Sequence, residues 1–458
     1  MNCSPIPIIS LGLLLACGCT VVQPTNLGAK LVPLVPDQPQ PGPPASTTAT
    51  APTIAAPGTL AACIELAMVQ NEAGGIARER IIQAEFGEQA VVAASRPSVS
   101  LEGRHERRKD VGGGGSGSFG SFLEPTDNEF KLRAETPLYS GFRNRSARRA
   151  AQAWRASRMA SLQHTHERTT LEVTEAYLEV LNAVHQGETL RSQLALQQAQ
   201  VDQMKLREAA SDARHSEVLL RQAQAAETNA AVIAASQDEA VARETLAFQV
   251  GRAAQNALAD PAIALPGNLS LAALRKAALR TRSDLAALKS AITARREEVE
   301  TVRRGYRPEV SLAGDYFLGR GGIAEDVDWV ISLEMSWNLA DSGRRAAQLG
   351  EARSLIGEAI LSHRKQLRQL DLDLRRILAE IRGAQARADA LQQSLTLANS
   401  AFEQATAEYE AGVGQNLEVL TAQDQRLRAQ LSIRQQALRL QLLAAELRVA
   451  TGQPLVSQ

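Results

Sequence analysis

The sequence predicts a mainly α-helical protein made of two similar halves, each of which also contains a pair of β-strands. Three observations predict this fold. The composition is 44% hydrophobic but only 3% aromatic, which is typical of long helices rather than of compact cores. An internal repeat divides the chain, and a heptad pattern runs through a long uninterrupted helix.

The charge balance argues against a nucleic-acid partner. Lys plus Arg number 50 and Asp plus Glu number 50, so the formal net charge is zero. Nucleic-acid binding needs a basic field that this composition does not supply.

The first residues resemble a lipoprotein signal peptide. The apolar run 8–16 is too short to span a bilayer as a helix, and it ends in Leu14-Leu15-Ala16-Cys17. We therefore predict a signal peptide at 1–17 with lipidation of Cys17. Two alternatives stay open, Cys19 as the acceptor or a signal cut without lipidation, since residues 1–10 lack the usual positive charge.

A proline-rich segment follows the predicted signal. Nine prolines lie between residues 20 and 59, among Ala, Thr and Gln. This composition favours extended conformations and builds no core. We predict a linker at 18–58, either as a tether for a lipid anchor or as a segment without a tethering role.

The repeat is clearest at an Arg-Pro motif. Residues 96–103 recur as 307–314, identical at six of eight positions and offset by 211. Beyond the motif the offset becomes 201 and stays there, because the first copy holds an extra glycine-rich stretch at 112–117. Insertions concentrate in exposed loops. We predict structural repeats at 59–266 and 267–458.

Each half contains two stretches in which apolar and polar residues alternate. The clearest apolar row is Trp329, Ile331, Leu333, Met335 and Trp337. Such rows, ending in aromatics and backed by charges, suit transmembrane barrel strands. Four strands cannot close a barrel, so other subunits must complete it. A small water-soluble sheet with one buried face remains the alternative.

The strands lead into very long helices. No proline interrupts residues 342–409, enough for about 100 Å of helix. A heptad seam runs through Leu370, Leu374, Ile377, Ile381, Ala384, Ala388, Leu391, Leu395, Ala398, Phe402, Ala405 and Tyr409. This spacing predicts coiled-coil packing. A matching helix with a less regular seam is expected at about 142–210.

Each long helix is expected to reverse at a turn. In the second half the turn at 409–414 contains Gly412 and Gly414, which permit the backbone angles of a reversal. Its counterpart at 211–215 has no glycine.

Together these features resemble the TolC family of outer membrane efflux proteins, over about residues 60–455. The turn pattern of that family is matched by Tyr409, Gly412, Glu418, Val419 and Leu420, and the Pro-Leu-x-x-Gly pattern before the long helix by residues 137–141.

The resemblance implies a homotrimer in which four strands per chain form a twelve-stranded transmembrane β-barrel, continued by an α-helical tunnel of coiled coils in the periplasm. It implies a passive exit duct for efflux or type I secretion, lipid-anchored in the outer membrane. The expected partners are a periplasmic adaptor, an inner-membrane transporter and outer-membrane lipid.

The resemblance also assigns roles to single residues. Tyr409, Gly412 and Gly414 would shape the periplasmic turn, and Glu418 and Thr421 would face a constriction. In a trimer, Glu418 would form a ring of three carboxylates that attracts cations. The alternative for Glu418 is an ordinary solvated charge. The expected membrane-interface aromatics are Phe130, Tyr316, Trp329 and Trp337.

No catalytic, cofactor or metal site is expected. His164 and His166 lie two residues apart on a helix without the spacing of a zinc site, and the glycine run at 112–117 lacks the Gly-Lys-Ser/Thr of a phosphate loop. Cys63 is expected to be a small buried apolar residue. The rival function is a non-conducting periplasmic coiled-coil lipoprotein.

Overall fold

The computed structural model describes residues 58–107, 126–211, 214–253, 257–320 and 327–455. The chain divides into the units Met1–Ile54 and Ala55–Gln458, and the described helices and strands all belong to the second unit. The predicted signal peptide at 1–17, both candidate lipid acceptors Cys17 and Cys19, the linker up to residue 57 and the glycine run at 112–117 lie outside the described residues.

The same order of elements occurs twice. The first half contains α1 (Leu60–Gln70), α2 (Glu72–Ala93), β1 (Ser98–Arg107), β2 (Thr126–Tyr139), α3 (Arg143–Ala209) and α4 (His215–Val250). The second contains α5 (Leu271–Thr281), α6 (Ser283–Arg304), β3 (Glu309–Arg320), β4 (Trp329–Ser336), α7 (Arg344–Glu410) and α8 (Asn416–Ala450). Both α3 and α7 have 67 residues. The order agrees with a duplication; the repeat boundaries remain a prediction.

Equivalent residues also share unusual backbone angles. The φ angles of Gly141 and Phe142 are 61° and 64°, and those of Ser342 and Gly343, offset by 201, are 52° and 87°. Positive φ is costly for residues other than glycine. Both halves therefore use the same left-handed kink between strand and long helix, although the glycine occupies different positions.

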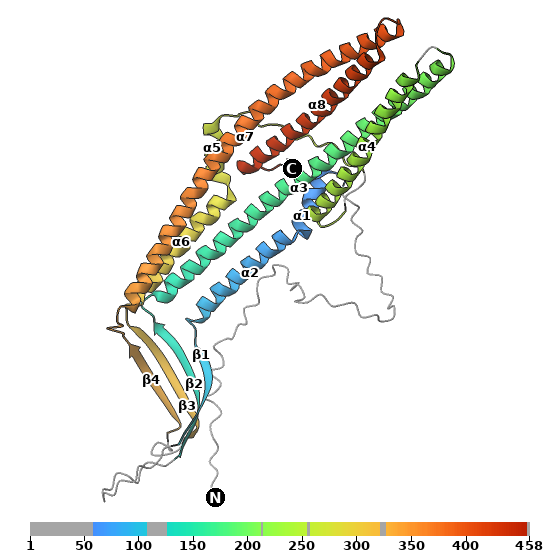
Figure 1. Cartoon of the computed structure of the whole chain (residues 1–458). Helices are drawn as coiled ribbons and strands as arrows, with labels where there is room; N and C mark the ends of the chain where they lie inside the picture. The colour runs from blue at the N-terminus through green and yellow to red at the C-terminus, as the bar shows by residue number, and fades with distance from the viewer. Residues whose placement is uncertain (1–57, 108–125, 212–213, 254–256, 321–326, 456–458) are drawn as a thin grey trace, which may run out of the picture. The chain divides into compact units, whose positions relative to one another are not determined.

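The four strands form one antiparallel sheet in the order β1-β2-β3-β4. The pairing of β2 with β3 joins the two halves, and register shifts interrupt it between Phe130 and Lys131 and between Pro137 and Tyr139. Figure 1 shows the sheet at one end of the long helices and the α3–α4 and α7–α8 turns at the other.

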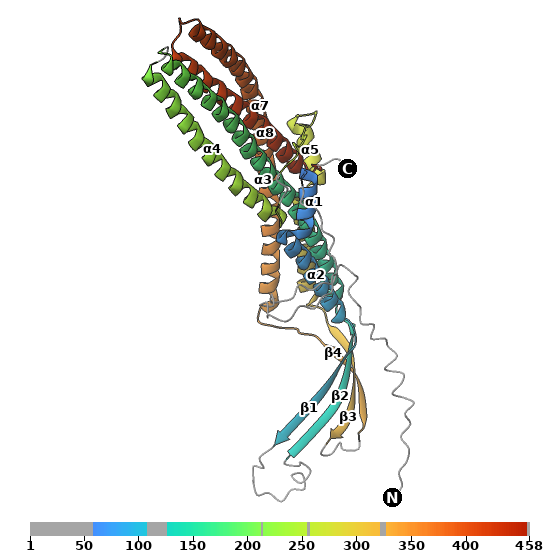
Figure 2. The ribbon, with the colours of Figure 1, turned by 90° about the vertical axis from the view of Figure 1, so that its right-hand side faces the viewer.

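The helices pack around two cores. One core combines α1, α3 and α4 around the fully buried Tyr177, and the other combines α5, α6, α7 and α8 around Leu374 and Leu443. The Tyr177 hydroxyl lies 3.1 Å from the Gly58 carbonyl oxygen and 2.7 Å from that of Ala259. Figures 1 and 2 show the α3–α4 and α7–α8 hairpins side by side.

The predicted heptad seam is the inward stripe of α7. Leu370, Leu374, Ile377, Ile381, Ala384 and Ala398 are buried, and the other seam positions are partly buried. Between them Leu372 is 59% exposed. The seam prediction is confirmed, since the stripe packs against α8 and the short helices of the same half.

Cys63 is fully buried in α1, as expected of a small apolar residue, and burial raises the pKa of its thiol to about 11. None of the helices in the described ranges has the length and apolar character of a membrane span.

Candidate functional site

One face of the sheet is an exposed apolar surface. Trp329, Ile331, Leu333 and Met335 of β4 are 64%, 66%, 68% and 69% exposed. Across the sheet, the ladder pairs Leu101 with Leu132, Leu132 with Tyr316, and Tyr316 with Trp329. We call this surface the apolar face. A water-soluble sheet would cover it, and its exposure is that of a surface made for lipid or for another chain.

The aromatics expected at a membrane interface all belong to this surface or its edge. Phe130 is 54% exposed, Tyr316 49%, Trp329 64% and Trp337 56%. The Trp337 Nε1 donates a hydrogen bond to the Tyr306 carbonyl oxygen at 3.1 Å. Their assignment to the interface stays a prediction.

The opposite face of the sheet carries a charge network. Arg133 on β2 donates to Glu334 on β4 at 3.0 Å and lies 3.4 Å from Asp315 on β3. Lys131 lies 3.5 Å from Glu102 on β1 and 3.9 Å from Asp315. The network therefore crosses all four strands, as expected for a face toward water.

The α7–α8 turn depends on both of its glycines for different reasons. Gly412 has a φ of +78°, which favours glycine. A Cβ on Gly414 would lie 3.0 Å from the Tyr409 backbone nitrogen, so a side chain there would force the neighbouring backbone to shift. The turn is held by hydrogen bonds from the Val413 and Gly414 amides to the Glu408 carbonyl oxygen, both at 3.0 Å.

The other hairpin has a left-handed residue at the equivalent position, but it is not a glycine. Ser211, offset by 201 from Gly412, has a φ of 66°. The two turns therefore share a left-handed residue at equivalent positions. The serine carries a backbone cost of about 1–2 kcal/mol that glycine avoids.

Glu418 has a local structural role that the sequence did not reveal. Its carboxylate accepts a hydrogen bond from the Gln415 backbone amide at 3.2 Å, and the reciprocal contact completes a capping box at the start of α8. Glu418 and Thr421 are both exposed, and at a spacing of three they lie on the same side of α8.

Buried polar side chains join the two hairpins near their turns. Arg221 of α4 donates to Gln200 of α3 at 2.8 Å and to Asn416 of α8. Arg221 is only 5% exposed and Asn416 6%. Burial lowers the pKa of Arg221. The nearby Glu217 carboxylate raises this pKa, but by less than burial lowers it. Separating the two hairpins here would leave a buried charge without its hydrogen bonds, which is costly.

Tyr409 makes a second connection between the hairpins. Its hydroxyl lies 3.9 Å from the Met204 sulfur, and the Arg207 guanidinium lies 5.6 Å from the centre of its ring. The sequence pattern assigned Tyr409 to the turn, but it did not indicate these contacts with α3.

No group of three or more His, Cys, Asp or Glu residues in the described ranges could hold a metal ion. His164 lies 3.7 Å from Glu167, and burial lowers the pKa of His166.

These features define a class of protein: long coiled-coil hairpins carried on a four-stranded sheet with one apolar and one charged face, the fold of an α-helical tunnel joined to a β-barrel. Residues 274–453 match the family model described as outer membrane efflux protein. The expected resemblance to the TolC family is thereby confirmed. The family model covers most of the second half.

Solved structures support the same fold. The chain is 21% identical to the outer membrane protein VceC of Vibrio cholerae, with a TM-score of 0.73 over 87% of this chain and 97% of that one. The chain is 16% identical to CusC, with a TM-score of 0.76 over 92% of this chain and 100% of that one. It is 17% identical to the open state of the Neisseria gonorrhoeae outer membrane channel MtrE, with a TM-score of 0.72 over 87% of this chain and 90% of that one.

No curated protein shows significant sequence similarity to the chain. At these identities the structural matches establish the fold alone. The neighbours named as channels are not enzymes.

Proposed function

We propose that this protein is the outer-membrane channel-tunnel of a tripartite efflux system, through which substrates pass by passive conduction. The observation that carries the proposal is the two-faced sheet. Its apolar face is exposed on all four strands, while a charge network spans the opposite face. Lipid on one side and water on the other require this division.

The unpaired sheet edges support a homotrimer. β1 and β4 each pair with a single neighbour, and open edges are not tolerated in hydrocarbon. Three copies of the four strands would give a closed twelve-stranded barrel. α4 also carries exposed apolar side chains that would pack against another subunit, since Ile233, Val241 and Phe248 are 52%, 67% and 76% exposed.

The α7–α8 turn is the proposed docking point for a periplasmic adaptor, which links the channel to an inner-membrane transporter. Val413 is 82% exposed and Leu417 58%. Apolar side chains with this exposure at the end of a long hairpin favour a protein contact. Lipidation of Cys17 would add an anchor in the outer membrane. The alternative to efflux is type I secretion of a protein through the same channel.

The proposed gate lies beside the same turn. In a trimer, three Glu418 carboxylates would meet near the axis with Thr421 one turn farther along α8. Such a ring attracts cations and hinders anions. The capping box fixes the start of α8 and with it the position of Glu418.

The competing function is a periplasmic spacer that conducts nothing. Detergent extraction followed by reconstitution into planar bilayers distinguishes the two. A channel gives an SDS-resistant trimer and discrete single-channel currents. Trimers that insert but carry no current under any applied voltage or salt would contradict the proposal and favour the spacer.

A further inference from the structure

Arginines gather where the strands meet the helices, around two pockets. The larger pocket has a volume of about 560 Å³ and is lined by Glu300, Arg303, Arg304, Tyr306, Arg307 and Leu349. The smaller, of about 250 Å³, is lined by Phe142, Arg145, Arg149 and Arg304. Arg304 lines both, and we call the two together the junction pockets. Their described lining holds five arginines and one carboxylate, so it is strongly positive.

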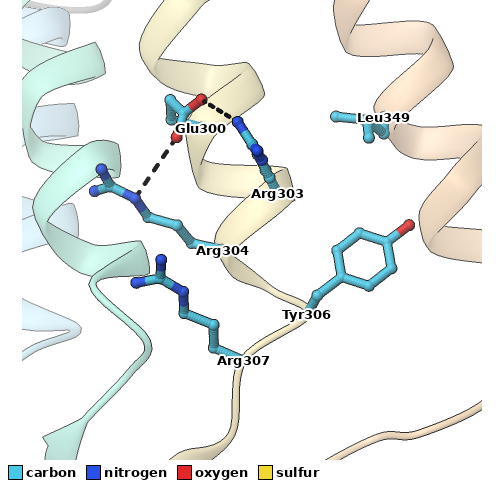
Figure 3. A pocket seen from close by; sticks show the side chains of 6 residues that line it. All are labelled: Glu300, Arg303, Arg304, Tyr306, Arg307 and Leu349. Carbon is cyan, nitrogen blue, oxygen red and sulfur yellow. Dashed lines mark ion pairs between the residues drawn. The ribbon is translucent and has the colours of Figure 1, made fainter.

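Contacts within the chain leave much of this charge uncompensated. Arg304 is occupied, since its Nη1 donates to the Phe142 carbonyl oxygen at 3.1 Å and to the Ser146 hydroxyl. The Glu300 carboxylate lies 3.6 Å from Arg303 and 3.9 Å from Arg304, as the dashed lines in Figure 3 mark. Arg149 lies 3.9 Å from the Glu297 carboxylate, and Arg307 Nη1 donates to the Gly141 carbonyl oxygen at 3.4 Å. Of the five arginines, Arg145 has no ion pair or hydrogen bond with any described residue. Guanidinium donors therefore remain available to a ligand.

The start of α3 adds to the positive field. α3 begins at Arg143 and has neither an acidic residue in its first turn nor a side-chain cap. At the start of α7, by contrast, the Asp341 carboxylate accepts a hydrogen bond from the Arg345 backbone amide at 3.2 Å. Helix N-termini are themselves positive and normally carry acidic residues, so an anion in the junction pockets would offset the charge at the start of α3.

The junction pockets adjoin the end of the apolar face. Trp337, 56% exposed, donates its hydrogen bond to the carbonyl oxygen of Tyr306. Beyond it Leu339 is 77% exposed. Figure 3 shows Tyr306 extending toward α7 while Arg304 and Arg307 extend toward α3. An apolar surface that passes directly into arginines matches a lipid, whose acyl chains continue into a charged headgroup.

We propose that the junction pockets bind the phosphodiester headgroup of an anionic phospholipid, with the acyl chains along the apolar face of β4. Guanidinium groups bind phosphate oxygens in pairs, and the neighbouring Trp337 and Leu339 supply the apolar contact that free phosphate would leave unused. This proposal rests on the proposed function, because it requires the strands to lie in a membrane.

The test uses the full-length channel in a neutral detergent, with phosphatidylglycerol carrying brominated acyl chains as the quencher of tryptophan fluorescence. The variant combines Arg145→Gln and Arg303→Gln, whose side chains are exposed. Binding is expected to weaken roughly fivefold per arginine, or about 25-fold for the pair. The matched control combines Arg168→Gln and Arg428→Gln, which remove equal charge from side chains 74% and 79% exposed elsewhere, and it should bind as the parent does.

Three results would overturn the proposal. These are equal binding of phosphatidylcholine and phosphatidylglycerol, unchanged binding by the double variant, and full displacement of the lipid by equimolar inorganic phosphate, which would assign the pockets to free anions. Single-channel currents are recorded in parallel. Currents without selective lipid binding contradict only this proposal, whereas lipid binding without currents contradicts the proposed function.

Discussion

One substitution can separate the capping contact of Glu418 from its proposed role in the gate. Glutamine also fits the third helical position of a capping box, so Glu418→Gln should keep the start of α8 while removing the charge. We expect the concentration of divalent cation that halves the single-channel current to rise at least about threefold. Glu418→Ala should give the same loss and also lower the free energy of unfolding by about 1 kcal/mol.

Planar-bilayer currents titrated with Mg²⁺ and thermal unfolding followed by circular dichroism measure the two effects. If Glu418→Gln left cation block unchanged, the carboxylate would be an ordinary solvated charge and not part of a constriction. If Glu418→Gln and Glu418→Ala reduced cation block and stability equally, glutamine would not replace glutamate in the cap. The loss of block would then follow from the lost cap and not from the lost charge.

At the scale of single elements, the α7 seam offers a matched pair of leucines. Leu374 is fully buried against α8 and the short helices, whereas Leu372 is 59% exposed on the same helix. We expect Leu374→Ala to lower the free energy of unfolding by about 2–5 kcal/mol, through lost burial and the cavity left behind. Leu372→Ala should change it by less than about 0.5 kcal/mol.

Thermal unfolding of the two variants, followed at a helix-specific wavelength, provides the comparison. Equal destabilisation would mean that Leu372 is also covered in the assembled channel. That outcome would contradict the single-seam description of α7 and would instead place a second packing surface on its other side.

Asp284 joins the short helices to α7 and predicts a pH dependence. Burial raises the pKa of its carboxyl, but hydrogen bonds from Arg282 and Gln366, at 2.7 to 2.9 Å, outweigh burial and hold the pKa below its usual value. Since the folded pKa is lowered, the stabilisation is present above the unfolded pKa of about 3.9 and is lost as the pH falls through the folded value.

Asp284→Asn should therefore cost about 1–3 kcal/mol at pH 7 and less at pH 3, below the unfolded pKa of about 3.9. Unfolding curves recorded at both pH values test this expectation. Asp371→Asn, which removes a more exposed carboxylate 2.7 Å from Arg275, is the control and should cost less than about 1 kcal/mol. A loss at Asp284 that did not shrink with acid would exclude the charge as its cause.

Apolar patterns in the sequence predicted some faces of the helices and strands but not the buried polar side chains. The alternation in β4 predicted the apolar and charged faces of the sheet, and the heptads of α7 predicted its buried stripe, because apolar spacing follows the period of each element. The stripe of α3 continues beyond Leu190 through Gln193 and Gln197, which are buried at 7% and 5% exposure. A search for apolar spacing passes over them, and likewise over Arg221 and Asn416, whose burial depends on a partner helix distant in sequence.

At the scale of the whole molecule, the two halves meet through contacts that the repeat did not specify. The β2–β3 pairing joins them within the sheet, and Arg221 with Asn416 joins them near the turns. A duplication predicts equal halves but leaves open which strand edges pair, because either arrangement satisfies the same alternation. Apolar contacts join the halves as well, since Leu438 and Leu442 of α8 pack against the core of α1, α3 and α4.

The closed barrel gives the prediction that tests the assembly most directly. β1 and β4 are opposite edges of one sheet, separated by β2 and β3, so their backbones lie about 14 Å apart within a chain at 4.8 Å per strand. A disulfide between them needs Cα atoms within about 7 Å. Ser100→Cys combined with a cysteine at Ser332, Glu334 or Ser336 can therefore form a disulfide only between chains.

If Cys17 carries the proposed lipid, Cys19 is the remaining free thiol near the N-terminus, so the test uses a Cys19→Ser background. One of the three combinations should give covalent trimers under mild oxidation, because only one register brings the thiols into contact. Cys63 should not interfere, since it is fully buried and its pKa is raised to about 11. Denaturing gels without reductant measure the product. Each single cysteine serves as a control and should stay monomeric on the gel. Covalent dimers without trimers in every combination would contradict a closed ring of three.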